Sequence, residues 1–129
     1  MNIIDTHTHL YLKQFKEDID SVINRSKDIG VKKFIIPAID SSHFDSMHSL
    51  KNKYPNNIYL MSGLHPTDVK KNFKDELVFV VNSLKTHDYV AIGEIGIDLY
   101  WDKTYLNEQQ EAFEFQIRLA KKNDLPIVI

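Results

Sequence analysis

The sequence predicts an α/β fold in which parallel βα units form the first half of a (β/α)8 barrel. Short apolar runs alternate with stretches of helical periodicity, and the centres of the apolar runs fall near residues 3, 34, 59, 91 and 127. A repeat of about 30 residues is the length of a βαβ unit with a parallel sheet. Four such units and one further strand amount to about half of a barrel that typically needs ~250 residues. We therefore expect residues 1–129 to be a single domain, the truncated N-terminal portion of such a barrel.

The expected strands are apolar on both faces, as strands covered by helices should be. Four amphipathic helices connect them, and Gly30 can close the first helix from a left-handed conformation. Asn107, with Gln110 three residues later, is the expected N-cap of the last helix. The strands are 2–5, 33–38, 58–62, 89–92 and one beginning at 126, and the helices are marked by apolar side chains within 15–29, 44–50, 77–84 and 113–120.

The barrel is incomplete within this sequence, which stops at Ile129 inside the fifth expected strand. An open half-barrel leaves its inner face and its sheet edges uncovered. Three arrangements answer this: the remainder of the chain is missing, another chain completes the barrel, or the sheet is flat and doubly wound. We favour a truncated product.

The composition is that of an ordinary globular chain, with 43% hydrophobic and 26% charged residues. The net charge of −2 provides no general attraction to nucleic acid, so phosphate binding needs a local site or metal ions. There is no cysteine, so a metal would be held by His, Asp and Glu, which suits Zn, Mn, Mg or Fe. No apolar run reaches the ~18 residues of a membrane span and no signal peptide precedes Asp5, so we expect no membrane partner and a cytoplasmic location.

A pair of histidines follows the first expected strand directly. Alternate residues of a strand point the same way, so His7 and His9 can aim two imidazoles at one point. Asp5 shares their face and is a candidate for orienting the imidazoles, as carboxylates beside metal ligands commonly do. A chance pair of histidines on a polar loop is the alternative, but the position at the carboxyl end of a strand favours a metal site.

Two further polar clusters follow the third and fourth strands. His65, held between glycine and proline in Gly63–Pro66, could bind a phosphate oxygen or act as a general acid or base. Glu94, in Gly93–Asp98, is a carboxylate suited to bridging two metals. Each cluster alone is equally compatible with a solvated turn. Together with the histidine pair they indicate one pocket at the carboxyl ends of the strands.

Other aromatic and histidine side chains admit less specific interpretations. We interpret His43, His48 and His87 as surface residues on helices or at a helix end. Trp101, with its neighbours Tyr100 and Tyr105, could stack a base or a sugar. Because aromatic side chains are more often buried, we favour a core-capping role for them.

Several segments, in this order, resemble the TatD family of metal-dependent deoxyribonucleases, which belongs with the amidohydrolase-like barrels. The similarity runs over the whole chain and is most specific in Gly93–Trp101. It implies a distorted TIM-like barrel and metal-dependent hydrolysis of DNA phosphodiester bonds, at DNA ends or in single strands, with two divalent cations (Mg2+, Mn2+ or Zn2+) per complete site. The segments are Asp5–Leu10, Gly63–Pro66, Gly93–Trp101 and Gln109–Ala120 leading into Leu125–Ile129.

The resemblance also implies roles for individual residues. His7 and His9 correspond to ligands of one metal, and Glu94 corresponds to the carboxylate that bridges or shares the two-metal centre. His65 matches a pocket histidine implicated in catalysis or phosphate binding. Asp98 matches the second acid of the motif and is expected to act beside the ligands rather than on the metal.

The chain ends before the ligand histidine into which the last strand of the family leads, and before a further histidine and an aspartate. We therefore expect this chain alone to be inactive. Two alternatives stay open: a related amidohydrolase or phosphoesterase, and a non-catalytic fragment that binds at most one metal weakly and self-associates through its open sheet edges.

Overall fold

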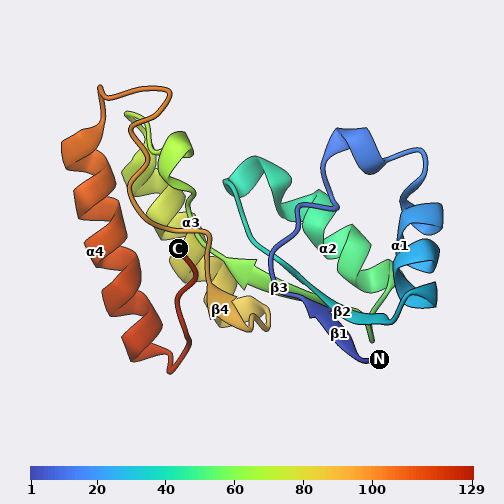
Figure 1. Ribbon diagram of the computed structural model, residues 1–129. Coiled ribbons are helices and arrows are strands. Elements are labelled where there is room, and N and C mark those ends of the chain that lie inside the picture. Colours follow the sequence, from blue (N-terminus) through green and yellow to red (C-terminus); the bar gives the residue numbers. More distant parts are fainter.

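A computed structural model describes residues 1–129 of the chain. Its strands form one parallel sheet in chain order, and the sheet curls with helices alternating between the strands (Figure 1). A doubly wound sheet would reverse its strand order near the middle, so the order along the sheet excludes that alternative. The strands are β1 (Ile3–Asp5), β2 (Val31–Ile36), β3 (Ile58–Ser62) and β4 (Ala91–Ile92).

The helices cover one face of the curled sheet. Each long helix follows one strand and precedes the next, except that α4 follows the last named strand. No helix is both long enough and apolar enough to cross a lipid bilayer. The long helices are α1 (Ile19–Asp28), α2 (Phe44–Lys53), α3 (Phe73–Thr86) and α4 (Leu106–Lys122), and short 3-10 turns lie at η1 (Lys13–Phe15), η2 (Ser41–His43) and η3 (Pro66–Asp68).

The expected fifth strand is present as a short parallel pairing beside β4. Ile127 forms a parallel bridge with Ile92. The Ile92 N–H donates to the Pro126 carbonyl at 2.9 Å, and the Val128 N–H donates to the Ile92 carbonyl at 2.9 Å. Four of the predicted strands are therefore confirmed, and the fifth is present only as this isolated bridge.

Two helix ends test predictions that were made from neighbouring residues in the sequence. Gly30 has φ 106°, so it ends α1 from the left-handed conformation that its place in the sequence predicted. The N-cap prediction for Asn107 is wrong, because α4 begins at Leu106 with Tyr105 as its N-cap. The Gln109 N–H donates to the Tyr105 carbonyl at 2.8 Å, which starts the first turn two residues earlier than the capping pattern indicated.

The core lies between the helices and the outer face of the sheet. Its largest part joins η1, α1 and α2 to β2 and β3, with Phe34, Ile36 and Ile58 almost fully buried. A second part lies under α3 and α4, and a third joins β4 to α4. Packing on this face fixes the strands, so that their carboxyl ends, with the loops that follow them, meet at one end of the sheet.

Candidate metal centre

Glu94 is placed by the backbone of the residue before it. The Gly93 N–H donates to the Ser62 carbonyl at 2.9 Å, and the Gly93 carbonyl accepts from the Ala38 N–H at 3.0 Å. A Cβ on Gly93 would lie 2.8 Å from the Val128 Cβ, so only glycine allows the neighbouring strand segments to approach this closely. The carboxylate of Glu94 therefore starts from a backbone tied to the ends of β2 and β3.

The histidine pair after β1 converges on this carboxylate from the opposite end of the strand order. His7 Nε2 lies 2.8 Å from Glu94 Oε2, and His9 Nε2 lies 3.6 Å from the same oxygen. One ligand atom from each of the three residues lies within 4.8 Å of the other two. The structure thus brings together groups that are 85 or more positions apart in the sequence.

Tyr11 orients His9, a role that sequence reasoning missed. The Tyr11 hydroxyl donates to the Pro37 carbonyl at 2.9 Å and lies 2.9 Å from His9 Nδ1. Since that hydroxyl proton is already used, the proton of neutral His9 lies on Nδ1, and the Nε2 lone pair faces Glu94. Continuing the alternation of positions 5, 7 and 9 to position 11 would have found Tyr11 in the sequence.

The environment of His9 favours the neutral form that metal binding requires. Burial lowers the pKa of His9 below its ordinary value, and the nearby His7 lowers it further, against an opposing effect of Glu94. Burial also raises the pKa of Tyr11, helped by the charges of Asp40 and Glu94, so the phenol keeps its proton.

His65 reaches the same carboxylate through its second nitrogen. The Thr67 N–H donates to His65 Nδ1 at 3.2 Å, which assigns the imidazole proton of neutral His65 to Nε2. That Nε2 lies 3.2 Å from Glu94 Oε1. His65 therefore presents a hydrogen-bond donor to the pocket, whereas His9 presents a lone pair. Thr67 is a second residue that sequence reasoning missed.

The two remaining acids of the motifs act on backbone groups. Asp5 Oδ1 accepts the N–H of His7 at 3.2 Å, which shapes the turn that carries the histidine pair. Asp98 Oδ1 accepts the N–H of Tyr100 at 2.9 Å, in the loop between β4 and α4. The structure does not bring Asp98 into the group of converging side chains.

Two buried glutamines of α4 hold the loops that carry the site. Gln116 accepts the N–H of Leu64 at 2.7 Å and donates to the Leu64 carbonyl at 3.2 Å, beside His65. Gln109 accepts the N–H of Asp98 at 2.8 Å and donates to its carbonyl at 2.9 Å. Both amides are almost fully buried. Each makes the hydrogen bonds that the backbone of its loop would otherwise need from water. In the sequence, the signal for both glutamines was a polar side chain on the apolar face of a helix.

The converging donors fit a divalent cation. Two imidazole nitrogens and a carboxylate oxygen are the ligand types found in hydrolytic zinc and manganese sites. The exposed fractions of the side chains of His7, His9 and Glu94 are 36%, 24% and 25%, so solvent reaches the group and water can complete the coordination. Three protein ligand atoms are the number that catalytic zinc sites commonly have.

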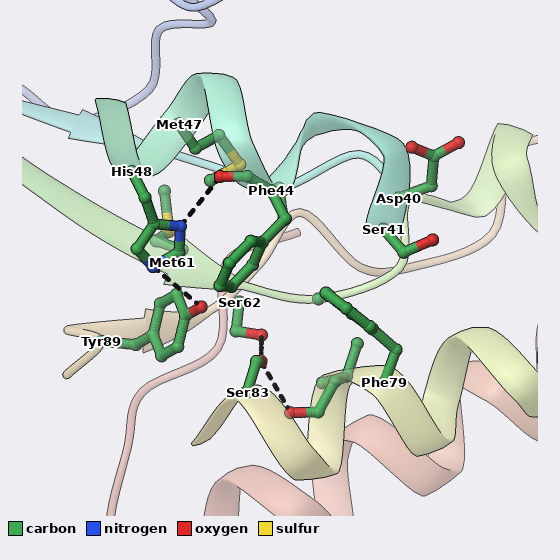
Figure 2. A pocket seen from close by; sticks show the side chains of 13 residues that line it. Asp40, Ser41, Phe44, Met47, His48, Met61, Ser62, Phe79, Ser83 and Tyr89 are labelled. Carbon is green, nitrogen blue, oxygen red and sulfur yellow. Dashed lines mark hydrogen bonds between the residues drawn. The ribbon is translucent and has the colours of Figure 1, made fainter. Parts of the chain in front are cut away.

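A second cavity lies away from this site and is too small for a substrate. It has a volume of about 20 Å³, room for about one water molecule, between α2, α3 and β3 (Figure 2). Its polar lining comprises the hydroxyls of Ser62 and Ser83, 3.1 Å apart, together with Asp40, Ser41, His48 and Tyr89. This cavity therefore offers no second substrate site.

Two sequence interpretations need correction. His48 is half-buried rather than on the surface. The centroids of its ring and the Phe44 ring are 4.0 Å apart, and its Nδ1 donates to the Phe44 carbonyl at 2.9 Å. Tyr100 and Trp101 do not cap the core, since both side chains are 81% exposed. Their loop is tied to α4 by the hydrogen bonds between Gln109 and the Asp98 backbone, and both rings lie in solvent.

Parallel βα units with ligands at the carboxyl ends of their strands define the class of barrel-type metal-dependent hydrolases. The family model described as TatD related DNase matches residues 4–129, and the chain belongs to that family. The family and the half-barrel that the sequence predicted are thereby confirmed.

Relatives agree with this assignment. The chain is 35% identical over 128 residues to a protein named "Uncharacterized metal-dependent hydrolase YabD" from Bacillus subtilis (strain 168), covering 98% of this chain and 49% of that protein. It is 27% identical over 128 residues to the "3'-5' ssDNA/RNA exonuclease TatD" of Pectobacterium carotovorum, again covering 98% and 49%. The crystal structure of YJJV, a TATD homolog from Escherichia coli K12, matches with a TM-score of 0.87 and 34% identity over 97% of this chain and 49% of that one. The chain spans about half the length of the curated relatives it matches.

Proposed function

We propose that this chain carries the N-terminal part of the active site of a metal-dependent nuclease that hydrolyses DNA phosphodiester bonds at ends or in single strands. The observation that carries the proposal is the convergence of His7, His9 and Glu94 within 4.8 Å, from two strands far apart in the sequence. Membership in the TatD-related DNase family and the likeness to a protein named as an ssDNA/RNA exonuclease support nucleic acid as the substrate.

The residues have distinct parts in this proposal. His7 and His9 would hold one divalent cation, and Glu94 would be the carboxylate shared with a second one. Mg2+, Mn2+ or Zn2+ bound there would supply Lewis-acid chemistry for the phosphoryl group and would make water more acidic. His65, whose Nε2–H points at Glu94 in the structure, donates to a phosphate oxygen or to the leaving oxygen. Asp5 and Asp98 keep the two loops in shape through their bonds to backbone N–H groups.

Residues 1–129 form, in this proposal, the N-terminal portion of a longer barrel, and the later ligands come from the remainder. The three converging ligand atoms leave a cation to fill its other positions with water. We therefore expect the 129-residue chain to bind one divalent cation and to show no nuclease activity alone. The cytoplasm stays the expected location on the sequence alone.

The test joins residues 1–129 to the C-terminal half of the Pectobacterium exonuclease, whose own activity serves as the positive control. The chimera should hydrolyse end-labelled single-stranded DNA with Mg2+ or Mn2+, and a chelator should abolish this. Glu94→Gln should lower the rate at least about 100-fold, since it removes a charged ligand of the reacting centre. Glu114→Gln, an exposed change on α4, should leave the rate unchanged.

Circular dichroism of each chimera shows whether it is folded, and isothermal titration of the 129-residue chain with Zn2+ or Mn2+ tests the cation site without turnover. Full activity of folded Glu94→Gln, or equal metal affinity of Glu94→Gln and the unchanged chain, would refute the assignment of Glu94. Hydrolysis of small phosphoesters or cyclic amides in place of DNA would favour the related amidohydrolase or phosphoesterase.

A second candidate is favoured by the edges of the sheet. β1 has a neighbour on one side only, and the segment at Ile127 pairs only with β4. Such edges promote association. A non-catalytic fragment that pairs with a copy of itself would show concentration-dependent sedimentation and weak binding of at most one metal.

A further inference from the structure

Two large aromatic side chains stand in solvent on the loop that follows Glu94. Tyr100 and Trp101 are each 81% exposed, and their rings meet edge to face with centroids 4.7 Å apart. They lie in the loop between β4 and α4, the loop that begins at Glu94 (Figure 1). Exposing this much aromatic surface costs free energy in water, which is why such side chains are usually buried or used in binding.

The loop that carries them is held in place by hydrogen bonds on both sides of the aromatic pair. Gln109, itself buried, binds the backbone N–H and carbonyl of Asp98. Asp98 Oδ1 accepts the Tyr100 N–H at 2.9 Å, and Asp102 Oδ1 accepts the Thr104 N–H at 2.8 Å. The rings are therefore presented by a braced loop, so that little ordering is left to be done when a ligand binds.

The aromatic pair shares its surroundings with the histidine of the pocket. Trp101 and Thr67 line the same small hollow, whose other lining residues are Lys70, Asp98, Asp102, Tyr105 and Gln109. Thr67 is the residue whose N–H donates to His65 Nδ1. A molecule resting on Trp101 therefore lies beside the loop that carries His65.

Positive charge lies beside this surface. Lys70 Nζ is 5.5 Å from the centroid of the Tyr105 ring and 3.9 Å from Asp102 Oδ2, and Lys71 and Lys103 are exposed neighbours in the sequence. Lys70 already pairs with Asp102, whereas Lys71 and Lys103 form no ion pair and are available to a polyanion. An aromatic face flanked by lysines matches a nucleobase followed by its phosphates.

We propose that Tyr100 and Trp101 form a stacking surface for an unpaired nucleobase of a single-stranded nucleic acid whose phosphodiester lies at the candidate metal centre. This inference rests on the proposed nuclease function and adds the place where the strand is held. A paired base within a duplex has both faces covered by its neighbours, so the surface selects single strands or frayed ends. Every base has an aromatic face, so the surface accepts any sequence.

The test uses the fluorescence of Trp101, the only tryptophan of the chain. The 129-residue chain, in EDTA so that no hydrolysis takes place, is titrated with a short oligothymidylate, with an abasic oligomer of the same length and with a duplex. We expect the oligothymidylate to quench the emission and to bind about 5-fold to 150-fold more tightly than the abasic oligomer, the range that stacking of one base provides. The duplex should bind as weakly as the abasic oligomer.

Variants separate stacking from simple attraction of charge. With a labelled oligothymidylate followed by anisotropy, Trp101→Ala and Tyr100→Ala should each bind at least about 5-fold more weakly. Trp101→Phe keeps an aromatic face and should recover most of the affinity. Val78→Ala, a change of an exposed apolar side chain on α3, should bind as the unchanged chain does.

Equal binding of the abasic and normal oligomers, or unchanged binding by Trp101→Ala, would overturn the proposal. So would a blue-shifted emission of Trp101 in the active chimera, since that would mean another part of the barrel covers the ring. The nuclease proposal is tested separately by metal-dependent hydrolysis. A hydrolysing chimera without stacking would remove only the present inference, and base-dependent quenching without hydrolysis would remove only the nuclease.

Discussion

At the scale of single residues, the orientation of each imidazole is set by a partner that is not itself a metal ligand. The Tyr11 hydroxyl accepts a hydrogen bond from Nδ1–H of His9, so the Nε2 lone pair of His9 faces Glu94. Thr67 does the reverse for His65, whose proton points into the pocket. The site thus contains two histidines with different roles. His9 presents a lone pair and His65 presents a proton, because their hydrogen-bond partners differ.

Removal of the Tyr11 hydroxyl tests this arrangement. Tyr11→Phe should lower the affinity for Zn2+ or Mn2+ about 10-fold to 100-fold, the usual effect of losing a partner that orients a metal-bound histidine. Nitrogen NMR of His9 should show Nδ1 protonated in the unchanged chain and a mixture of tautomers in the variant. Tyr89→Phe removes a hydroxyl far from the site and provides the control. Unchanged affinity and an unchanged tautomer in Tyr11→Phe would show that Tyr11 does not orient the ligand.

His48 provides a residue-scale prediction about pH. Burial lowers the pKa of His48 below its ordinary value of 6.5, and the nearby His87 adds to this, against the Phe44 carbonyl. The unfolded chain therefore binds the proton more readily than the folded chain, and the free energy of unfolding falls as the pH drops below about 6.5. His48→Gln should lose less of that free energy between about pH 7.5 and pH 5.5 than the unchanged chain. Urea unfolding at each pH measures the difference, and equal losses in both proteins would contradict the prediction.

At the scale of elements, the carboxyl ends of β3 and β4 approach so closely that side chains are excluded. A Cβ on Gly63 would lie 3.1 Å from the Gly93 carbonyl oxygen, and one on Gly93 would meet Val128 and Met61. In the sequence, Gly63 and Gly93 each stand beside a site residue at the end of a strand. The structure shows that close packing of backbone is the reason for them.

Gly93→Ala should therefore destabilise the fold by about 1–3 kcal/mol, the range found for overfilled packing. The added methyl group has backbone-linked atoms of Val128 on one side and the Met61 sulfur on the other, so neither a rotamer change nor solvent can relieve the contact fully. Urea unfolding measures the change. Ser49→Ala, at an exposed position of α2, is the control and should leave the free energy of unfolding almost unchanged. A stable Gly93→Ala variant would mean that the segment at 126–129 is easily displaced.

At the scale of the whole molecule, the curled sheet has two free edges and an inner face that the helices do not cover. Ile4 on β1 is 51% exposed, and Ile129 at the other edge is 75% exposed. Exposed apolar strands with unpaired backbone groups are sites of association.

We expect the 129-residue chain to associate as its concentration rises, as measured by sedimentation velocity. Ile4→Lys should weaken this association, because a charge on an edge strand opposes pairing with another strand. Val78→Lys is the control: Val78 is 59% exposed on the helix α3 and belongs to no strand. A chain that stays monomeric at every concentration would show that the edges are protected in another way.

Predictions that depend on neighbouring residues agree with the structure, and predictions that depend on contacts between distant segments agree less well. Apolar runs and helical periodicity are local, and they predicted the strand order, the helices and the end of α1 at Gly30 correctly. The site residues were predicted because each sits at a strand end, where a parallel sheet gathers side chains. The prediction for Asn107 was wrong because α4 begins with a turn at Tyr105, before the capping pattern. The prediction for His48 was wrong because its ring packs against the ring of Phe44.

By itself, the sequence determined that this is a chain of parallel βα units with His7, His9, His65 and Glu94 at the ends of its strands. Only the tertiary structure decided which nitrogen of each imidazole faces the carboxylate, and that Tyr100 and Trp101 stand in solvent. The physical reason is distance along the chain. Periodicity is written in neighbouring residues, whereas the hydroxyl of Tyr11 on Pro37 and the clamp of Gln109 on Asp98 exist only after separate segments have packed together.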